Sequence, residues 1–382
     1  MFELRPIAGL RRYPFLEPPQ EASMTMNFGI FFELEVPETG YTERDMWHNA
    51  LTQIEFAEKM GFDSAYSVEH HFNPGYSHSS CPEILFAAAS QRTKTIRLGT
   101  GVQLLPIDHP VRTAEKIAAI DCLTDGRYDF GVGRGAYTPE FLTFDKPHAQ
   151  GATKDLNRDL FSECIDIIKT CWTKNNFTYE GKFYKIPAPI TVVPKPIQNP
   201  WPRMFAACGS PDSYEMYPRM GMHIMPQTAV TPLDQMAAQL PTALQSWKKA
   251  GHDKTMGPLQ INTLVPVHCA KTTKLAIDQM KSYEMWYFSK LIEFFTPKTD
   301  TERARHANLP QWWTNPNWDY VYGEKMVICG DPKDCIETVK EFEAAGVNRL
   351  MCQFQVGGMP HTMVMEAMRL WGEEVIPFFK SR

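Results

Sequence analysis

Short apolar runs alternate with amphipathic stretches along the chain from residue 27 to the C-terminus. The apolar runs have the length of buried strands, which predicts strands at residues 27–32, 63–68, 96–100, 128–132, 204–208, 223–225, 260–267 and 349–354. The amphipathic stretches predict helices at residues 46–60, 82–92, 110–123, 155–172, 211–220, 232–250, 274–295, 332–345 and 363–379. About eight strands alternating with helices indicate parallel strands with right-handed crossovers. They favour an α/β fold of the closed (β/α)8 TIM barrel type, with insertions, over an open sheet.

Some segments depart from this alternation. Residues 1–26 have no clear period and carry four prolines, so they form either an N-terminal arm on the body or a disordered tail. Residues 177–184 indicate a hairpin, and the proline-dense residues 187–202 are expected to be an extended loop. A single barrel domain is expected over 27–382, with a polar inserted lid at 296–325 that carries Trp312, Trp313 and Trp318.

Composition narrows the classes of function. Hydrophobic residues make up 43% of the 382 residues and charged residues 22%, so the chain can bury a large core. The net charge of -5 argues against a nucleic-acid binder, which needs a basic face. No apolar run reaches the roughly 18 residues of a membrane span, and the N-terminus lacks the apolar region of a secretory signal. The nine cysteines form no C-x-x-C pair, so we expect reduced thiols in a cytoplasmic protein and no metal site.

Candidate chemistry follows from the rule that such a barrel builds its active site at the C-terminal ends of its strands. Glu69, His70 and His71 stand directly after the second predicted strand. Imidazoles titrate near neutral pH, so His70 and His71 are candidate catalytic residues for proton transfer. Adjacent side chains point to opposite sides, so one histidine is expected to face the cavity, and a structural role stays open. A metal site with His78 and Cys81 is a further alternative, although a third ligand at proper spacing is missing.

Two strand ends and one helix start offer groups for a planar or phosphorylated ligand. Gly101 ends the third strand, where a glycine lets the backbone approach a planar ligand, although a plain turn glycine has the same signature. The run Gly131-Val-Gly-Arg-Gly is one residue short of a dinucleotide fingerprint, so Arg134 is better explained as a phosphate clamp. The helix start after the fifth strand suits a phosphate monoester or simple N-capping, and its candidate ligands are Gly209, Ser210 and Ser213.

Taken together, these stretches resemble the bacterial luciferase-like flavin-dependent monooxygenase family. The resemblance covers most of the chain and is clearest over residues 27–225. It rests on the order and spacing of short motifs, which are Phe28-Gly-Ile-Phe-Phe, Gly61-Phe-Asp-Ser-Ala-Tyr-Ser-Val-Glu-His-His-Phe, Ile96-Arg-Leu-Gly-Thr-Gly-Val, His109-Pro-Val-Arg, Gly126-Arg-Tyr-Asp-Phe-Gly-Val-Gly-Arg-Gly and Gly209-Ser-Pro.

The resemblance implies a barrel that binds reduced FMN (FMNH2), supplied by a separate NAD(P)H:flavin reductase. In this family O2 adds to C4a of the flavin, and the resulting peroxide or hydroperoxide inserts one oxygen atom into an organic substrate. By resemblance His70 matches the catalytic histidine, and Gly101-Val102 matches a non-proline cis peptide bond under the flavin ring. A homodimer is usual in the family. The cofactor-binding residues that the resemblance and the strand ends together indicate are Gly101, Val102, Arg134, Ala136 through its backbone, Gly209, Ser210 and Ser213.

Two positions depart from the light-emitting members of the family. Gly133 stands where they carry a reactive cysteine, and Gly209 where they carry a glutamate, so light emission is not expected. A small, largely apolar organic substrate is expected. The alternatives are an F420-dependent oxidoreductase on the same barrel, a non-catalytic flavin-binding relative and a metal-dependent hydrolase. Residues expected to line the substrate site are Phe32, Phe72, Tyr76, Gln103 and Tyr137.

Overall fold

The predicted strands form one ring of parallel strands in the computed structural model, which describes residues 25–36, 41–146, 154–296 and 317–382. Hydrogen-bonded neighbours follow the order β10-β12-β1-β2-β3-β5-β8-β9, and the parallel bridges Ile224–Ile261 and Gln227–Leu264 join β9 to β10. The prediction of a (β/α)8 barrel is therefore confirmed. The ring strands are β1 (Asn27–Phe32), β2 (Ser64–Ser67), β3 (Arg97–Thr100), β5 (Tyr128–Gly133), β8 (Arg203–Ala207), β9 (His223–Met225), β10 (Asn262–Cys269) and β12 (Arg349–Gln353).

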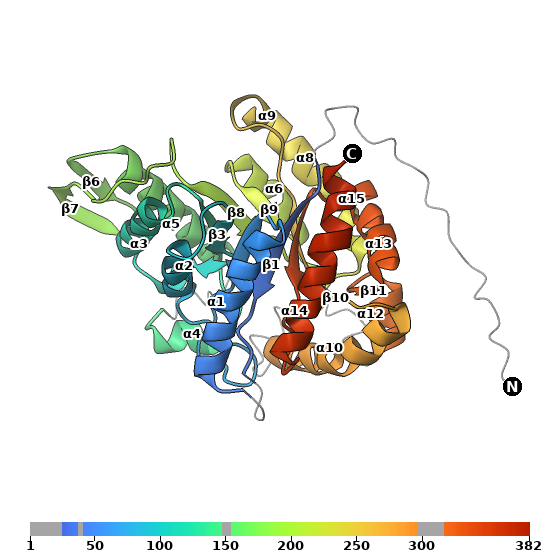
Figure 1. Cartoon of the computed structure of the whole chain (residues 1–382). Helices are drawn as coiled ribbons and strands as arrows, with labels where there is room; N and C mark the ends of the chain where they lie inside the picture. Colours follow the sequence, from blue (N-terminus) through green and yellow to red (C-terminus); the bar gives the residue numbers. More distant parts are fainter. Residues whose placement is uncertain (1–24, 37–40, 147–153, 297–316) are drawn as a thin grey trace, which may run out of the picture.

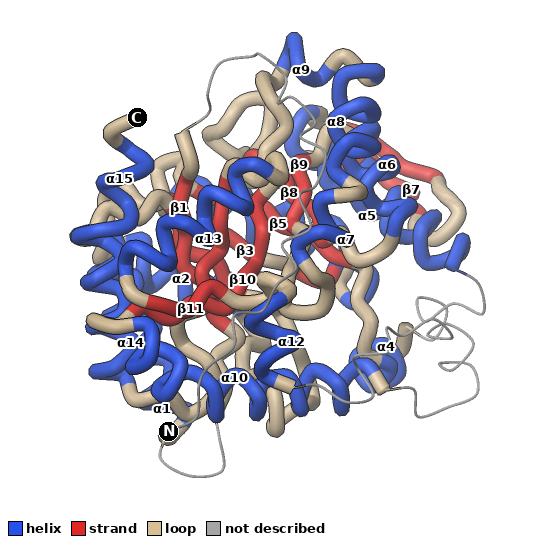
Figure 2. Tube along the Cα trace, turned by 90° about the vertical axis from the view of Figure 1, so that its right-hand side faces the viewer, coloured by secondary structure: helices blue, strands red, loops and turns tan. Residues whose placement is uncertain are grey.

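Helices surround the strands, as Figures 1 and 2 show. Thr42 caps the first of them, because its side chain accepts a hydrogen bond of 3.1 Å from the backbone N–H of Asp45. The carboxylate of Asp45 in turn accepts a hydrogen bond from the backbone N–H of Thr42, which completes a capping box. The main helices are α1 (Glu43–Lys59), α2 (Pro82–Ser90), α3 (Pro110–Leu123), α5 (Lys154–Thr173), α6 (Pro211–Arg219), α10 (Thr273–Phe295), α13 (Pro332–Ala344) and α14 (His361–Leu370).

Three predicted elements that contain prolines differ from the prediction. The helix predicted at 232–250 is divided into α7 (Leu233–Ala237) and α8 (Leu240–Lys249), because Pro241 has no N–H to donate and fits only a first turn. The predicted terminal helix continues from α14 through a π-helical turn into α15 (Ile376–Lys380). Part of the predicted proline-rich loop is strand β7 (Lys185–Ile190), which pairs with β6 (Phe177–Glu180) in a two-stranded sheet whose free edges tolerate proline.

Short elements escaped prediction because they are too short to show a period. Strand β4 (Gln103–Leu104) pairs with β5, and β11 (Ile328–Gly330) pairs with β10 outside the ring. The unpredicted helices and helical turns are the 3₁₀ turn Leu105–Ile107, α4 (Thr138–Thr143), α9 (His252–Thr255) and α12 (Trp318–Gly323).

The expected lid and N-terminal arm lie largely outside the described residues, which exclude 297–316 and 1–24. At the described end of this segment Trp318 and Val321 of α12 are buried in the main hydrophobic core, and the lid itself stays a prediction. No helix in the described part of the chain is both long and apolar enough to cross a lipid bilayer.

Two hydrophobic layers pack on the opposite faces of the strands. Phe31 belongs to a cluster inside the ring, with Tyr66, Val68, Val102, Phe205, Met225, Leu264 and Met351. Phe32 belongs to the larger core between strands and helices, because adjacent residues of a strand point to opposite faces. The expectation that Phe32 lines the substrate site is therefore corrected.

An ion-pair network closes the N-terminal end of the ring. The buried carboxylate of Asp129 accepts hydrogen bonds from Arg97 at 2.6 Å, from Arg203 at 2.6 Å and from the Tyr66 hydroxyl at 2.7 Å. Both arginines are the first residues of their strands, β3 and β8. This end is therefore filled, and the opposite end is left for a functional site.

Candidate active site

The C-terminal ends of the strands bring the predicted site residues to one end of the barrel. His70 lies in the loop after β2, Gly101 directly after β3, Arg134 directly after β5, and Ser210 in the loop after β8. These strands are successive neighbours in the ring, so their ends form one continuous edge.

His70 is held by a carboxylate that sequence reasoning missed. Its Nδ1 lies 3.3 Å from Oε1 of Glu140, a fully buried residue of α4. The same oxygen accepts a hydrogen bond of 3.1 Å from the backbone N–H of His71. Burial lowers the pKa of His70, but the hydrogen bond and charge of Glu140, together with the charges of Glu33 and Glu69, raise this pKa above its ordinary value. His70 is thus suited to hold a proton near neutral pH.

His71 has its own carboxylate and different surroundings. Its Nε2 lies 3.2 Å from Oε1 of Glu69, and its ring packs on Phe144 at 4.9 Å between centroids. The ring of His70 packs instead on Phe294, at 5.0 Å. The two imidazoles therefore have different carboxylate partners and different aromatic neighbours, and which of them faces the cavity stays a prediction.

The backbone of Gly101 lies against the hydrophobic cluster inside the ring. Its peptide bond with Val102 is cis, as the resemblance implies. A Cβ atom on Gly101 would lie 3.3 Å from Phe31, 3.4 Å from Tyr66 and 3.5 Å from Met351. This position therefore presents bare backbone between the interior cluster and the barrel mouth.

Three of the predicted phosphate-binding residues, Arg134, Ser210 and Ser213, lie on α6 or contact it. Burial raises the pKa of Tyr217, on α6, to about 12, and the charge of the Arg134 guanidinium, together with a hydrogen bond to it, opposes this rise. The buried Ser213 Oγ accepts a hydrogen bond of 3.2 Å from the Ser210 N–H, which is the capping role considered above. The Ser210 Oγ is also buried, and it has no hydrogen-bond partner among the described residues.

A second guanidinium at the same place was not predicted. Arg158 of α5 forms an ion pair with Asp212 in the first turn of α6, and its charge also acts on Tyr217. In the sequence it is one polar position of a periodic helix, and only the packing of α5 shows its neighbours. The remaining predicted cofactor residues, Ala136 and Gly209, are exposed in the loops after β5 and β8.

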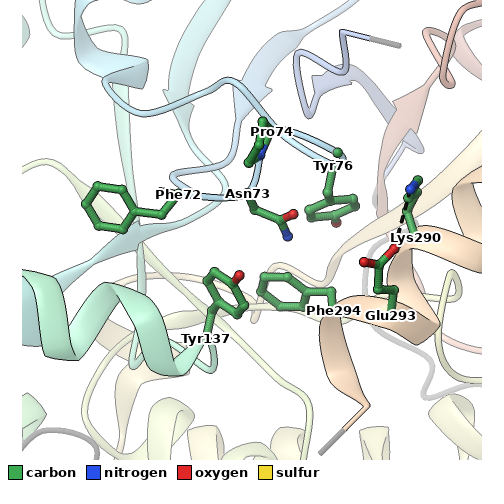
Figure 3. Close-up of a pocket in the computed structure, with 9 residues that line it drawn as sticks. Phe72, Asn73, Pro74, Tyr76, Tyr137, Lys290, Glu293 and Phe294 are labelled. Atoms are coloured by element: carbon green, nitrogen blue, oxygen red, sulfur yellow. Dashed lines mark hydrogen bonds and ion pairs between the residues drawn. The ribbon is translucent and has the colours of Figure 1, made fainter. Parts of the chain in front are cut away.

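A pocket of about 190 Å³ (Figure 3) is lined by Tyr76 and Phe294, whose rings pack on the ring of His70. Three of the expected substrate-lining residues, Phe72, Tyr76 and Tyr137, line it, and so do Asn73, Pro74, Gly75, Lys290, Glu293 and Phe294. Tyr137 and Phe294 stack at 4.9 Å between ring centroids, and Figure 3 shows their rings side by side with Tyr76 nearby. Gln103 is not among the lining residues; it is buried on β4, and neither polar atom of its amide has a partner in the described structure.

His78, one of the residues weighed for a metal site, has other partners. His78 lies 3.2 Å from Glu43 through Nδ1 and 3.0 Å from the Pro74 carbonyl through Nε2. Within the described ranges, no group of three or more His, Cys, Asp or Glu side chains is arranged to hold a metal ion.

The sequence of this chain is similar to the sequences of known monooxygenases. The chain is 28% identical over 370 residues to the oxygenase component of the flavin-dependent trigonelline monooxygenase of Acinetobacter baylyi, covering 93% of this chain and 96% of the relative. It is 26% identical over 381 residues to the alkanal monooxygenase alpha chain of Photorhabdus luminescens, covering 94% of this chain and 98% of the relative.

Solved structures share the barrel. Monooxygenase RslO1 from Streptomyces bottropensis superposes with a TM-score of 0.78 at 25% identity, covering 93% of this chain and all (100%) of that one. The FMN complex of the oxygenating constituent of 3,6-diketocamphane monooxygenase from Pseudomonas putida gives 0.76 at 21% identity, covering 93% and 99%. The F420-dependent tetrahydromethanopterin reductase of Methanopyrus kandleri gives 0.69 at 20% identity, with the same coverage of 93% and 99%. At these last two identities the likeness concerns the fold alone.

A match to a protein-family model shows to which family this chain belongs. The model described as luciferase-like monooxygenase matches residues 26–349, which include seven of the eight ring strands, the first residue of β12 and all the site residues above. This chain therefore belongs to the luciferase-like monooxygenase family and is an oxidoreductase.

Proposed function

We propose that this protein is an FMNH2-dependent monooxygenase that inserts one oxygen atom of O2 into a small, largely apolar organic substrate. The other oxygen atom leaves as water, and a separate NAD(P)H:flavin reductase supplies the reduced flavin. The observation that carries the proposal is the shared edge of the barrel, where a proton-holding His70, the bare backbone of Gly101 and the cationic N-terminus of α6 follow one another.

The residues present fit FMN at both of its ends. A buried polar group without a partner costs about 1–3 kcal/mol, so such groups call for a ligand or water. The Ser210 hydroxyl is such a group beside the arginines, and the Gln103 amide is such a group on β4, close to the position expected for the ring. A phosphate monoester and the polar edge of a flavin supply matching acceptors and donors.

Each cofactor residue then has a separate task. Arg134, Ser210 and Ser213 would hold the phosphate, together with the backbone of Ala136 and Gly209, because guanidinium groups and helix N-termini bind phosphate strongly. Arg158 would add a second positive charge at the same place. Gly101 and Val102 would carry the ring.

The chemistry divides between cofactor and protein. Reduced FMN, when bound, supplies the electron pair that activates O2. The protein must hold a proton near the reacting atoms and exclude water. Glu140 occupies Nδ1 of His70, which leaves Nε2 to hold that proton, and His71 stays a second candidate through its pairing with Glu69.

The close packing at Gly133 argues against light emission. A Cβ atom at Gly133 would lie 2.5 Å from Cγ2 of Val102, so this backbone has no room for the cysteine of the light-emitting relatives.

Two measurements test the proposal. Purified protein is titrated anaerobically with reduced FMN and with reduced F420, and product is then analysed after turnover with a flavin reductase and isotopically labelled O2. We expect tight binding of reduced FMN and one labelled oxygen atom in the product. Preference for F420 would favour the hydride-transfer alternative, and FMN binding without incorporation across a broad substrate panel would favour the non-catalytic one.

A homodimer is proposed from the resemblance. Light scattering during gel filtration would give the mass directly.

A further inference from the structure

Three buried carboxyl groups lie at the barrel mouth, and apart from the charge of Glu33 that acts on His70 they are not used by the chemistry above. Glu33 and Glu35 follow β1, and Glu284 lies on α10. Their exposed fractions are 3%, 1% and 0%. Acidic side chains are almost never buried this completely unless they are paired, so this cluster requires an explanation.

Hydrogen bonds satisfy only part of the cluster. Oε1 of Glu33 accepts hydrogen bonds from the hydroxyl groups of Tyr76 at 2.8 Å and Tyr287 at 3.4 Å. Glu35 accepts from the Gln353 amide at 3.2 Å and from the backbone N–H of Gly357. The second oxygen of Glu33 and both oxygens of Glu284 have no partner in the described part of the chain.

The nearby cations are already matched by other carboxylates. His70 pairs with Glu140, and His71 pairs with Glu69. At the pocket rim, Lys290 lies 3.4 Å from Glu293, so this pair adds no net charge. Within the described ranges no lysine or arginine forms an ion pair with any of the three carboxyl groups of the cluster.

The protonation of these three carboxyl groups is expected to depend on whether a cation is bound next to them. Burial raises the pKa of Glu284 to about 8. It also raises the pKa of Glu33, against the opposing charge of His70, and the pKa of Glu35, to which the charges of Glu33 and Glu284 add. Without a ligand, burial thus favours the protonated forms of these groups. A bound cation would favour their ionised forms and displace the protons.

Aromatic rings next to the cluster restrict the kind of cation. Tyr76 stacks on Tyr287 at 5.9 Å and lies 5.3 Å from Phe294, between ring centroids. Tyr76 and Phe294 also line the pocket beside His70, so one hydroxyl group separates Glu33 from that pocket. Aromatic faces attract organic cations, whereas the described residues offer no ligand set for a metal ion.

We propose that the substrate carries a positively charged nitrogen, as an ammonium group or an N-alkylated ring, which the free oxygen of Glu33 receives with Glu35 and Glu284 behind it. Its apolar body lies against the aromatic walls of the pocket. This inference rests on the proposed function and names the substrate class for the same site.

Calorimetric titration with two probes of similar size tests this inference. Benzylammonium carries the charge, and benzyl alcohol is its neutral counterpart. We expect benzylammonium to bind about 10-fold tighter or more. Its binding should release protons, seen as a binding enthalpy that depends on the buffer, and should weaken as the pH falls because the carboxyl groups regain their protons.

Isosteric variants assign the effect to the cluster. Glu33→Gln and Glu284→Gln should each reduce the preference for benzylammonium and the proton release, whereas Glu337→Gln, which removes an exposed carboxylate of α13 outside the pocket, should keep both. Equal affinities for the two probes, no binding of benzylammonium, or an unchanged preference in Glu33→Gln would overturn the inference. Binding of reduced FMN is measured separately, so a failure of the proposed function is distinguished from a failure of cation recognition.

Discussion

Oε1 of Glu140 lies 3.3 Å from Nδ1 of His70, although 70 positions separate the two residues in the sequence. The loop after β2 and the short helix α4 after β5 thus meet at one imidazole. Because the carboxylate is buried and the His70 side chain is only 15% exposed, their interaction is weakly screened. The protonation of His70 therefore depends on Glu140.

The first prediction concerns this pair. Glu140→Gln removes the charge that raises the pKa of His70, so the imidazole should lose its proton at lower pH and the pH profile of product formation should shift to lower pH. His70→Ala should reduce the coupling of O2 to product by about 10²-fold or more, the scale of a lost acid–base group. NMR titration of the imidazole and the pH profile measure these effects.

The exposed pair of His78 with Glu43 provides the control. Glu43 lies 3.2 Å from Nδ1 of His78, and its side chain is 73% exposed, so Glu43→Gln should leave the profile unchanged. If Glu140→Gln left the titration of His70 where it is in the wild type, Glu140 would have no electrostatic role.

The second prediction concerns the phosphate-binding end. Arg134→Ala should weaken binding of reduced FMN by about 1.5–3 kcal/mol, which is the usual free-energy contribution of a hydrogen bond to a charged group. Fluorescence or calorimetric titration gives the dissociation constant. Arg112, which is exposed and pairs with Glu115 on α3, supplies the control, because Arg112→Ala removes the same group elsewhere. Equal affinities in the wild type and Arg134→Ala would remove Arg134 from the site.

The sequence predicted the parts of this molecule that follow local rules. Strands such as β1 and long helices such as α5 and α10 have clear periods, and residues at strand ends converge because parallel strands share one edge. Glu140 could not be found this way, because α4 has only six residues and the contact with His70 is not local. Glu284 appeared as one polar position of a long helix, and only the packing of α10 against the barrel mouth buries it.

The third prediction concerns the space at Gly133. A Cβ atom there would lie 2.5 Å from Cγ2 of Val102, so Gly133→Ala should destabilise the protein by about 1–3 kcal/mol, as overpacked cores do. Adding Val102→Ala removes the clashing methyl group, so the double variant should recover part of this loss. Thermal unfolding compares the variants. Gly323→Ala, whose added Cβ atom meets nothing within 4 Å, should change little. A stable Gly133→Ala protein would show that the backbone yields at this position.

The last prediction concerns the closed end of the barrel. Burial favours a protonated Asp129, but the charges and hydrogen bonds of Arg203 and Arg97 prevail and hold the pKa of this carboxyl far below its usual range. An unfolded aspartate titrates near about 3.9. The stabilisation from Asp129 is therefore fully present above that pH and is lost as the pH falls toward the folded-state pKa. Breaking a buried pair from one side costs about 3–5 kcal/mol, which is the loss expected for Asp129→Asn at neutral pH.

Urea denaturation at several pH values separates this effect from a general loss of charge. Asp129→Asn should lower the free energy of unfolding at neutral pH and reduce its decline in acid, because the variant no longer binds a proton on unfolding. Asp159→Asn removes an aspartate that lies 2.7 Å from Lys182 but is 54% exposed, so its loss should stay below about 1 kcal/mol. Similar losses in the two variants would mean that the Asp129 network contributes no more than a surface ion pair, and the barrel floor would then depend on apolar packing alone.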